Sequence, residues 1–311
     1  MANNQQSYGV FLSYYLSRTT FPGQKPLDFA FVGGLNFGAA MLSAPMVTGL
    51  CRRTGIKPLM TTGAFILGGG FVAASFATRI WHLYLTQGAL VGVGVGFVYV
   101  PSIPVLSQWF ERRRSLANGI STAGSGIGGL IFSFCTGAML RNWSLPWALR
   151  IVGIVALIAN LVATTFIRDR NAVIRPKQRP FDGGLFLRPA VLWLLAWSFI
   201  SMLGYITLLY SLSDFALSIN LSSQQAVEIT ALLNTGTAVG RPLIGVASDR
   251  FGRFNVSAGL TLFCGLCCFV VWIPATSYGV TLFFAIISGA ILGVFWVVSA
   301  VHPPLRIKSL F

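Results

Sequence analysis

The sequence predicts an all-α protein that crosses a membrane many times. Three observations predict it: long apolar runs, a low content of charge, and positive residues gathered in alternate gaps between the runs. Of the 311 residues, 55% are hydrophobic and only 9% are charged. A soluble domain carries about 25% charged residues, so a water-soluble core does not explain this composition.

Nine runs are long enough to cross a bilayer as helices, which takes about 20 mostly apolar residues. They cover residues 27–50, 58–78, 83–109, 116–140, 146–167, 189–213, 225–247, 254–275 and 278–300. A tenth run, at 7–16, is too short to span and is interpreted as the tail of an incomplete helix. The runs are apolar on all sides, whereas the strands of a membrane β-barrel alternate in polarity. We therefore expect helices.

Small residues recur inside these runs at spacings that bring membrane helices close together. The chain has 34 glycines, and some are spaced by four residues within one run: Gly88, Gly92 and Gly96, then Gly124 and Gly128. Membrane helices approach where side chains are small. We expect most of these glycines to serve packing.

The positive charges predict the orientation and a division of the chain. Of the 22 Lys and Arg residues, sixteen lie in one alternate set of gaps and five in the other, and Arg241 lies within a run. The positive-inside rule makes the richer set cytoplasmic. Its longest gap predicts an N-terminal helix bundle at 1–167 with an incomplete first helix, a cytoplasmic linker at 168–188 and a C-terminal bundle at 189–311.

Several functional classes are disfavoured by the same distribution. The net charge of +15 does not gather on a soluble face, as nucleic-acid binding requires. Cys264, Cys267 and Cys268 lie in an apolar run with no second ligand pair, so we predict no zinc site and no disulfide. No nucleophile–base pair or carboxylate dyad lies in the runs. We expect no enzyme, catalytic residue, metal or cofactor.

One motif lies in a cytoplasmic turn and reads Gly-Val-Ala-Ser-Asp-Arg-Phe-Gly-Arg, from Gly245 to Arg253. Gly252 permits a tight turn, and Asp249 can accept hydrogen bonds from a helix N-terminus or pair with an arginine. The motif resembles the loop signature of the major facilitator superfamily. The resemblance implies two pseudo-symmetric helical bundles and a gating role for Gly245, Asp249, Arg250, Gly252 and Arg253. A weaker copy lies six runs earlier, where Arg53 and Gly55 match Arg250 and Gly252, but Arg52 replaces the acid.

A second motif runs from Trp109 and Phe110 through Arg112 and Arg113 to Gly119 and continues to Ser125. It resembles the fifth-helix signature of monocarboxylate transporter-like proteins, and the sequence as a whole is most similar to the fungal branch of that family. Alternatively, its residue types could reflect only topology and small-residue packing. The resemblance covers about residues 7–300. Its matching positions are Trp109, Phe110, Arg112, Arg113, Leu116, Ala117 and Gly119, followed by Ala123, Gly124 and Ser125.

Arg241 is the third feature, because a charge within a membrane helix costs about 2.5–3.5 kcal/mol on insertion scales. Either its long side chain reaches the interface, or it faces a central cavity and pairs with a carboxylate. The resemblance implies the second role, since family members carry a substrate-binding arginine before proline here. Asn234 and Thr237 fall on the same helical face, and we take the three as the candidate substrate site. Unlike animal members, the chain has Thr237 where they have an acid, and no lysine at 7–12.

The resemblance implies a secondary transporter of small organic solutes that works by alternating access. The substrate would be a carboxylate-type anion, with proton coupling as in the family and the plasma membrane as the location. The partners would then be a small molecule and the lipid bilayer, and no nucleic acid. Family members have twelve helices, so about ten would be present, with the first incomplete and the last two missing. The alternatives are a non-transporting paralogue, an incomplete gene model and a membrane nutrient sensor.

Overall fold

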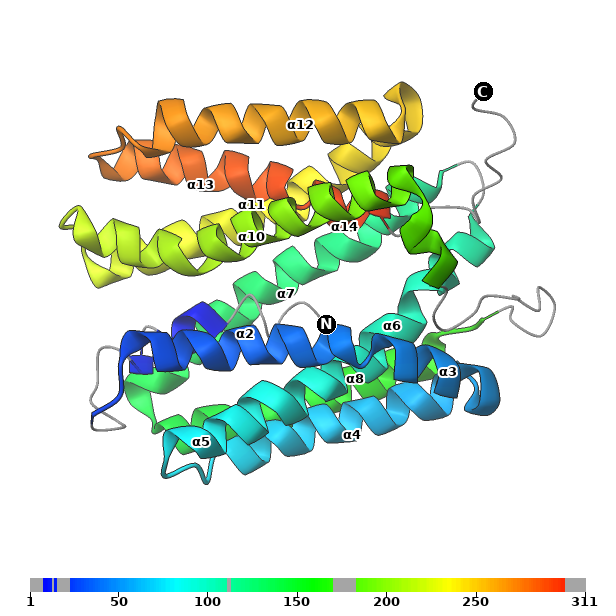
Figure 1. Cartoon of the computed structure of the whole chain (residues 1–311). Coiled ribbons are helices and arrows are strands. Elements are labelled where there is room, and N and C mark those ends of the chain that lie inside the picture. Colours follow the sequence, from blue (N-terminus) through cyan, green and yellow to red (C-terminus); the bar gives the residue numbers. More distant parts are fainter. Residues whose placement is uncertain (1–7, 13, 16–22, 111–112, 170–182, 300–311) are drawn as a thin grey trace. The chain divides into compact units, whose positions relative to one another are not determined.

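The computed structural model describes the chain except for residues 1–7, 13, 16–22, 111–112, 170–182 and 300–311. Within the described residues the regular structure is helical throughout, without strands, as predicted. The chain forms two compact units (Figure 1). Unit 1 comprises Met1–Gln108 and Ile131–Gly183, and unit 2 comprises Trp109–Leu130 and Gly184–Phe311. The predicted division at 168–188 stays a prediction, but the first part of the helix Arg114–Asn142 belongs with unit 2.

Unit 1 is built on helices that mostly begin or end at a proline, glycine or serine. Pro26 starts α2, and Ser43 separates α2 from α3 with a bend of 43°. Prolines favour the first turn of a helix because their missing N–H has no partner there. The helices are α2 (Pro26–Leu42), α3 (Ala44–Thr54), α4 (Ile56–Ala74), α5 (Ile80–Leu83), the π-helical η1 (Tyr84–Leu90), α6 (Val91–Trp109) and α8 (Leu145–Phe166). Of the partial run at 7–16, residues 8–12 and 14–15 are described and helical.

Unit 2 contains the first part of α7 (Arg114–Asn142) and the helices from α10 onward. α11 starts with a capping box, in which Ser222 Oγ accepts the Gln225 N–H and the Gln225 side chain accepts the Ser222 N–H. The remaining elements are η2 (Gly183–Leu187), α10 (Pro189–Ser218), α11 (Ser223–Phe251), α12 (Arg253–Cys267), the π-helical η3 (Cys268–Trp272), α13 (Tyr278–Leu292) and α14 (Val294–Ser299).

Seven helical segments of the described residues are long and apolar enough to cross a membrane, or eight if the bent pair α2 and α3 is one span. They match the predicted runs except for 225–247. That run forms α11, which has 29 residues but is not among the sufficiently apolar helices. The description of this run as apolar on all sides is therefore wrong, because a buried polar face follows its length.

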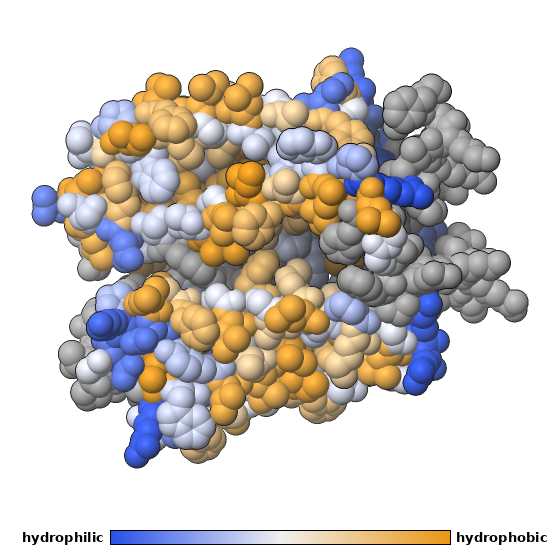
Figure 2. All heavy atoms as spheres, in the orientation of Figure 1, coloured by the Kyte–Doolittle hydropathy of each residue, from blue (hydrophilic) through white to orange (hydrophobic). Residues whose placement is uncertain are grey.

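The surface agrees with a lipid environment. On the face shown in Figure 2, apolar side chains cover much of the helices and hydrophilic ones gather near the helix ends. Large apolar side chains are widely exposed on α12 and η3, including Leu262 at 68% and Phe269 at 72%. Monomeric soluble proteins rarely expose contiguous apolar surface of this kind.

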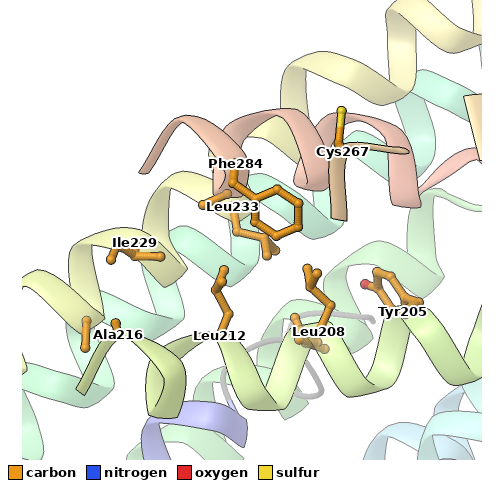
Figure 3. Packing of buried hydrophobic residues seen from close by; sticks show 11 residues of the cluster. Tyr205, Leu208, Leu212, Ala216, Ile229, Leu233, Cys267 and Phe284 are labelled. Carbon is orange, nitrogen blue, oxygen red and sulfur yellow. The ribbon is translucent and has the colours of Figure 1, made fainter. Parts of the chain in front are cut away.

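The core of unit 2 is an apolar cluster between α10, α11 and α13 (Figure 3). Leu208 and Leu212 of α10 point toward Leu233 of α11 and Phe284 of α13. Cys267 lies in the same cluster, which supports the interpretation of the cysteine group as packing. The cluster holds α11 against α13.

Glycines allow the closest helix approaches, as predicted for Gly88 and Gly92, which face Leu35 and Asn36 of α2. Gly96 faces Ser43, whereas Gly124 has open space around it and is not a packing glycine. In α4, a Cβ at Gly68 would lie 2.9 Å from Leu157 Cβ of α8. Small residues therefore set the α4–α8 spacing.

Gly68 and Gly69 provide a matched test of this packing. We expect Gly68→Val to destabilise the protein by about 1–3 kcal/mol through overpacking, lowering the melting temperature measured in detergent. Gly69→Val changes the same helix, but nothing lies within 4 Å of its Cβ. Equal melting temperatures for the two variants would contradict the glycine-mediated contact.

Candidate functional site

The polar face of α11 is the most distinctive feature of unit 2. Its five polar side chains follow one another at spacings of three, four or seven residues, which places them on one side of a helix. All are buried, with exposed fractions between 0% and 8%: Thr230, Asn234, Thr237, Arg241 and Ser248. The structure thus brings the three predicted substrate-site residues onto one buried stripe, together with two that the sequence analysis did not single out.

Arg241 is 2% exposed and is held by α7. Its Nη1 donates to the Thr122 carbonyl oxygen at 2.7 Å and to Ser125 Oγ. Room for the side chain comes from Gly293, where a Cβ would lie 2.5 Å from Arg241 Nε. The guanidinium is therefore fixed inside the helix packing and does not reach an exposed interface.

The backbones of α7 and α11 approach closely around this arginine. A Cβ at Gly119 would lie 2.5 Å from the Arg241 carbonyl oxygen, and one at Gly126 would lie 2.6 Å from the Ala238 nitrogen. Small residues permit such contact in membrane helices. Because the backbones are so close, Thr122 and Ser125 can reach the guanidinium.

Thr237 has its hydrogen bonds made within the fold. Its Oγ1 lies 3.1 Å from the Leu233 carbonyl oxygen and 3.0 Å from the Gly289 carbonyl oxygen of α13. One hydroxyl proton serves these two acceptors. Thr237 therefore connects α11 to α13, and in this conformation it is less available to a ligand than Arg241 or Asn234.

Asn234 is the opposite case. Its side chain is 0% exposed, and neither Oδ1 nor Nδ2 has a hydrogen-bond partner among the described residues. Leaving a buried polar group unpaired costs about 1–3 kcal/mol. Such a group calls for a specific explanation.

The loop signature forms a second contact between α11 and α7. Asp249 Oδ1 accepts the Ser115 N–H at 3.2 Å and Oδ2 accepts the Leu116 N–H at 3.0 Å. These amides belong to the first turn of α7, whose N–H groups have no partner within their own helix. A carboxylate there also interacts favourably with the helix dipole. Asp249 thus caps a helix more than a hundred residues earlier in the chain.

Other residues of the loop support this cap. Arg253 Nε donates to Ser115 Oγ at 3.2 Å, and a Cβ at Gly245 would lie 2.6 Å from the Ser115 carbonyl oxygen. Gly252 has a φ of +87°, a backbone conformation that favours glycine. Arg250 is exposed and lies over the Phe251 ring at 5.5 Å.

The weaker copy of this turn adopts a similar geometry. Gly55 lies between α3 and α4 with a φ of +86°, close to the +87° of Gly252 between α11 and α12. The predicted correspondence between these two glycines therefore has a conformational basis.

The second motif lies at the start of α7. Trp109 and Phe110 are about half exposed, and Arg113 is exposed just before the helix. Arg112 lies outside the described residues. Leu116, Ala117 and Gly119 are in the first turns of α7, and the intervening Asn118 donates from Nδ2 to the Trp296 and Val297 carbonyl oxygens at 2.7 and 2.9 Å.

The sequence reasoning missed the role of Thr122, and it noted Ser125 only as part of a small-residue stretch. Their spacing of three places both on the face of α7 that follows Gly119. That spacing was visible in the sequence, but their pairing with an arginine more than a hundred residues later was not.

Comparison with known proteins identifies the family of this fold. The family model described as Major Facilitator Superfamily matches residues 4–305. Two relatives from Saccharomyces cerevisiae are similar along most of the chain. The uncharacterized transporter ESBP6 is 35% identical over 300 residues, covering 93% of this chain and 45% of the relative. The probable transporter MCH2 is 34% identical over 295 residues, covering 93% of this chain and 62% of the relative.

A solved structure shows the same fold. The proton:xylose symporter XylE bound to 6-bromo-6-deoxy-D-glucose aligns with a TM-score of 0.70 at 14% identity, covering 96% of this chain and 79% of that chain.

The chain belongs to the Major Facilitator Superfamily, as predicted from its motifs. The two yeast relatives are named as transporters, one uncharacterized and one probable, and neither is named as an enzyme. The chain spans about half to three-fifths of the length of the two yeast relatives.

The Asp249 cap can be tested by removing its charge. We expect Asp249→Asn to destabilise the protein by about 1–2 kcal/mol, because the charged cap of α7 is weakened. Thermal unfolding in detergent measures this change. Asp214→Asn removes an exposed acid from α10 and is the matched control. If both variants have the melting temperature of the wild type, Asp249 does not stabilise α7.

Proposed function

We propose that the protein is a secondary transporter of small organic anions, with Arg241 as the group that binds the substrate carboxylate. The observation that carries this proposal is a guanidinium buried to 2% exposure on the polar face of α11. A guanidinium matches the geometry of a carboxylate in two parallel hydrogen bonds. An ionisable residue inside a membrane segment is a functional-site hypothesis by default.

The surroundings of Arg241 support a binding role because they hold its side chain in one orientation. Nη1 is fixed by a carbonyl oxygen and a hydroxyl, and both are uncharged acceptors. An anion bound here would pair with the guanidinium in a low-dielectric site, where charge pairing is strong. Fixing the arginine in advance also lowers the entropic cost of binding.

Alternating access would use the contact between Asp249 and α7 as a gate. In this proposal the cap stabilises the conformation in which the start of α7 lies against the end of α11. Its two hydrogen bonds are partly exposed, so water could replace them when the helices separate. Such a contact can be broken and remade at modest cost.

The remaining parts of the proposal follow the family. In many transporters of this superfamily, two bundles alternate around a midplane site, and we propose the same cycle here. The XylE neighbour is a proton:xylose symporter, and we propose that transport by this protein is also coupled to protons. We propose the plasma membrane as the location and the lipid bilayer as the surrounding partner.

Removing the Arg241 charge tests the proposal directly. We expect Arg241→Gln to lower uptake of labelled short carboxylates at least about tenfold, because a charge-assisted contact worth about 1.5–3 kcal/mol is lost. Transport is measured in both directions in vesicles containing the purified protein. Arg141→Gln removes an exposed charge from α7 and should transport normally. Unchanged carboxylate transport by Arg241→Gln would overturn the assigned role.

The gate predicts a change in accessibility. Ser248 is 2% exposed beside Asp249, so a cysteine at this position should react slowly with a water-soluble thiol reagent. We expect Asp249→Asn to speed labelling of Ser248→Cys several-fold in a background lacking the five native cysteines. Equal labelling rates with and without Asp249 would show that this contact does not hold the gate closed.

A further inference from the structure

The starting observation is the unpaired amide of Asn234. Its side chain is fully buried on α11, and both its donor and its acceptor lack a partner. An asparagine amide can donate two hydrogen bonds and accept about two more. Within the described residues, none of these possible hydrogen bonds of Asn234 is formed, although α11 is closely packed around it.

Neighbouring polar groups on the same face are treated differently. Thr230 Oγ1 donates to the Ala226 carbonyl oxygen at 3.1 Å, and Thr237 is bonded to its own helix and to α13. The Ser248 hydroxyl is also unpaired, but it lies at the other end of the stripe, beside the Asp249 cap. Between Thr230 and Thr237 on this face, the polar group without a hydrogen-bond partner among the described residues is therefore the Asn234 amide.

Asn234 lies in register with Arg241. Seven residues separate them, which is close to two helical turns, so both side chains leave α11 on nearly the same side. The axial rise over seven residues is about 10 Å. Helical side chains lean toward the N-terminus, so the long Arg241 side chain leans toward Asn234 and shortens this separation.

The backbone at Asn234 is also packed against α7, the helix that orients Arg241. A Cβ at Gly126 would lie 2.6 Å from the Asn234 carbonyl oxygen, and Ser125, the preceding residue, holds the guanidinium. Arg241 and Asn234 therefore both lie along the contact between α7 and α11.

We infer that Asn234 recognises a neutral hydrogen-bonding group on the transported anion, so that the substrate is a carboxylate carrying an amide, hydroxyl or carbonyl group several bonds away. This inference rests on the proposed function, because it assumes that Arg241 binds the carboxylate. An amide can donate to a carbonyl and accept from an N–H or O–H group of the ligand. A site built to hydrogen-bond a ligand group discriminates strongly against an analogue that lacks the group.

The test uses pairs of carboxylates that differ in one terminal group. Each acid with a terminal carboxamide, such as succinamate, is compared with its branched alkyl counterpart of the same shape, here 4-methylpentanoate. Chains with two to four methylene groups sample the separation of the two sites. Uptake and binding are measured for the full chain in vesicles and in detergent.

For the wild type we expect a preference of at least about tenfold for one or more carboxamide acids over the alkyl counterpart. Asn234→Leu should abolish this preference while alkyl acid uptake is retained. It should not lower the melting temperature, because the amide it removes has no partner in the part of the chain that the structure describes. Thr230→Val is the matched control, since its hydroxyl is already bonded within the helix, and it should keep the preference.

The outcomes separate the two proposals. If Arg241→Gln loses uptake of both acids while Asn234→Leu keeps the wild-type preference, the role of Asn234 is overturned and that of Arg241 stands. If Arg241→Gln takes up both acids as well as the wild type does, or if the wild type binds neither acid, the proposed anion site is overturned and this inference with it. A large fall in the melting temperature of Asn234→Leu would show that the amide is structural, which also overturns the inference.

Discussion

The arrangement of unit 2 depends on placing one guanidinium inside a membrane helix. A charge at such a position costs several kilocalories per mole unless polar groups surround it. Here the helix α7 provides those groups through Thr122 and Ser125. They reach Arg241 because glycines remove the side chains that would hold the two backbones apart. Charge, hydrogen bonding and small-residue packing are therefore parts of one constraint.

The same helix pair carries a second and weaker contact at its end. Asp249 accepts two amide hydrogen bonds of α7 in a partly exposed position, whereas Arg241 is almost fully buried. Water competes for the hydrogen bonds of the partly exposed Asp249 contact. At the buried Arg241 contact water is excluded, and the low dielectric constant strengthens the hydrogen bonds. The end of the pair is therefore easier to open than its centre, which is the order of stability that the proposed gate beside the proposed binding site requires.

The sequence predicted the helical class well because composition and run length follow directly from the bilayer thickness. It also predicted the polar stripe, since Asn234, Thr237 and Arg241 are close enough in the chain for helical spacing to place them. The polarity of α11 was underestimated, because Thr230 was counted within an apolar run and the buried Ser248 lies just beyond the end of that run. The partners Thr122 and Ser125 could not be predicted, because local periodicity says nothing about which distant helix lies alongside. The bend at Ser43 was also missed. The run at 27–50 has the length and composition of one straight span, and these do not reveal a bend within it.

The contrast between Thr237 and Asn234 bears on how such a site is maintained. Both residues are buried on one face, but the fold satisfies the threonine and leaves the asparagine unpaired. Packing alone would favour an apolar residue at position 234, since replacing an unpaired amide by an apolar group of similar shape is neutral or stabilising. In the proposed site, a ligand that forms hydrogen bonds with the Asn234 amide would explain a polar residue at this position. Functional sites commonly trade stability for such readiness to bind, and an unpaired amide on a buried helix face is a cost of that kind.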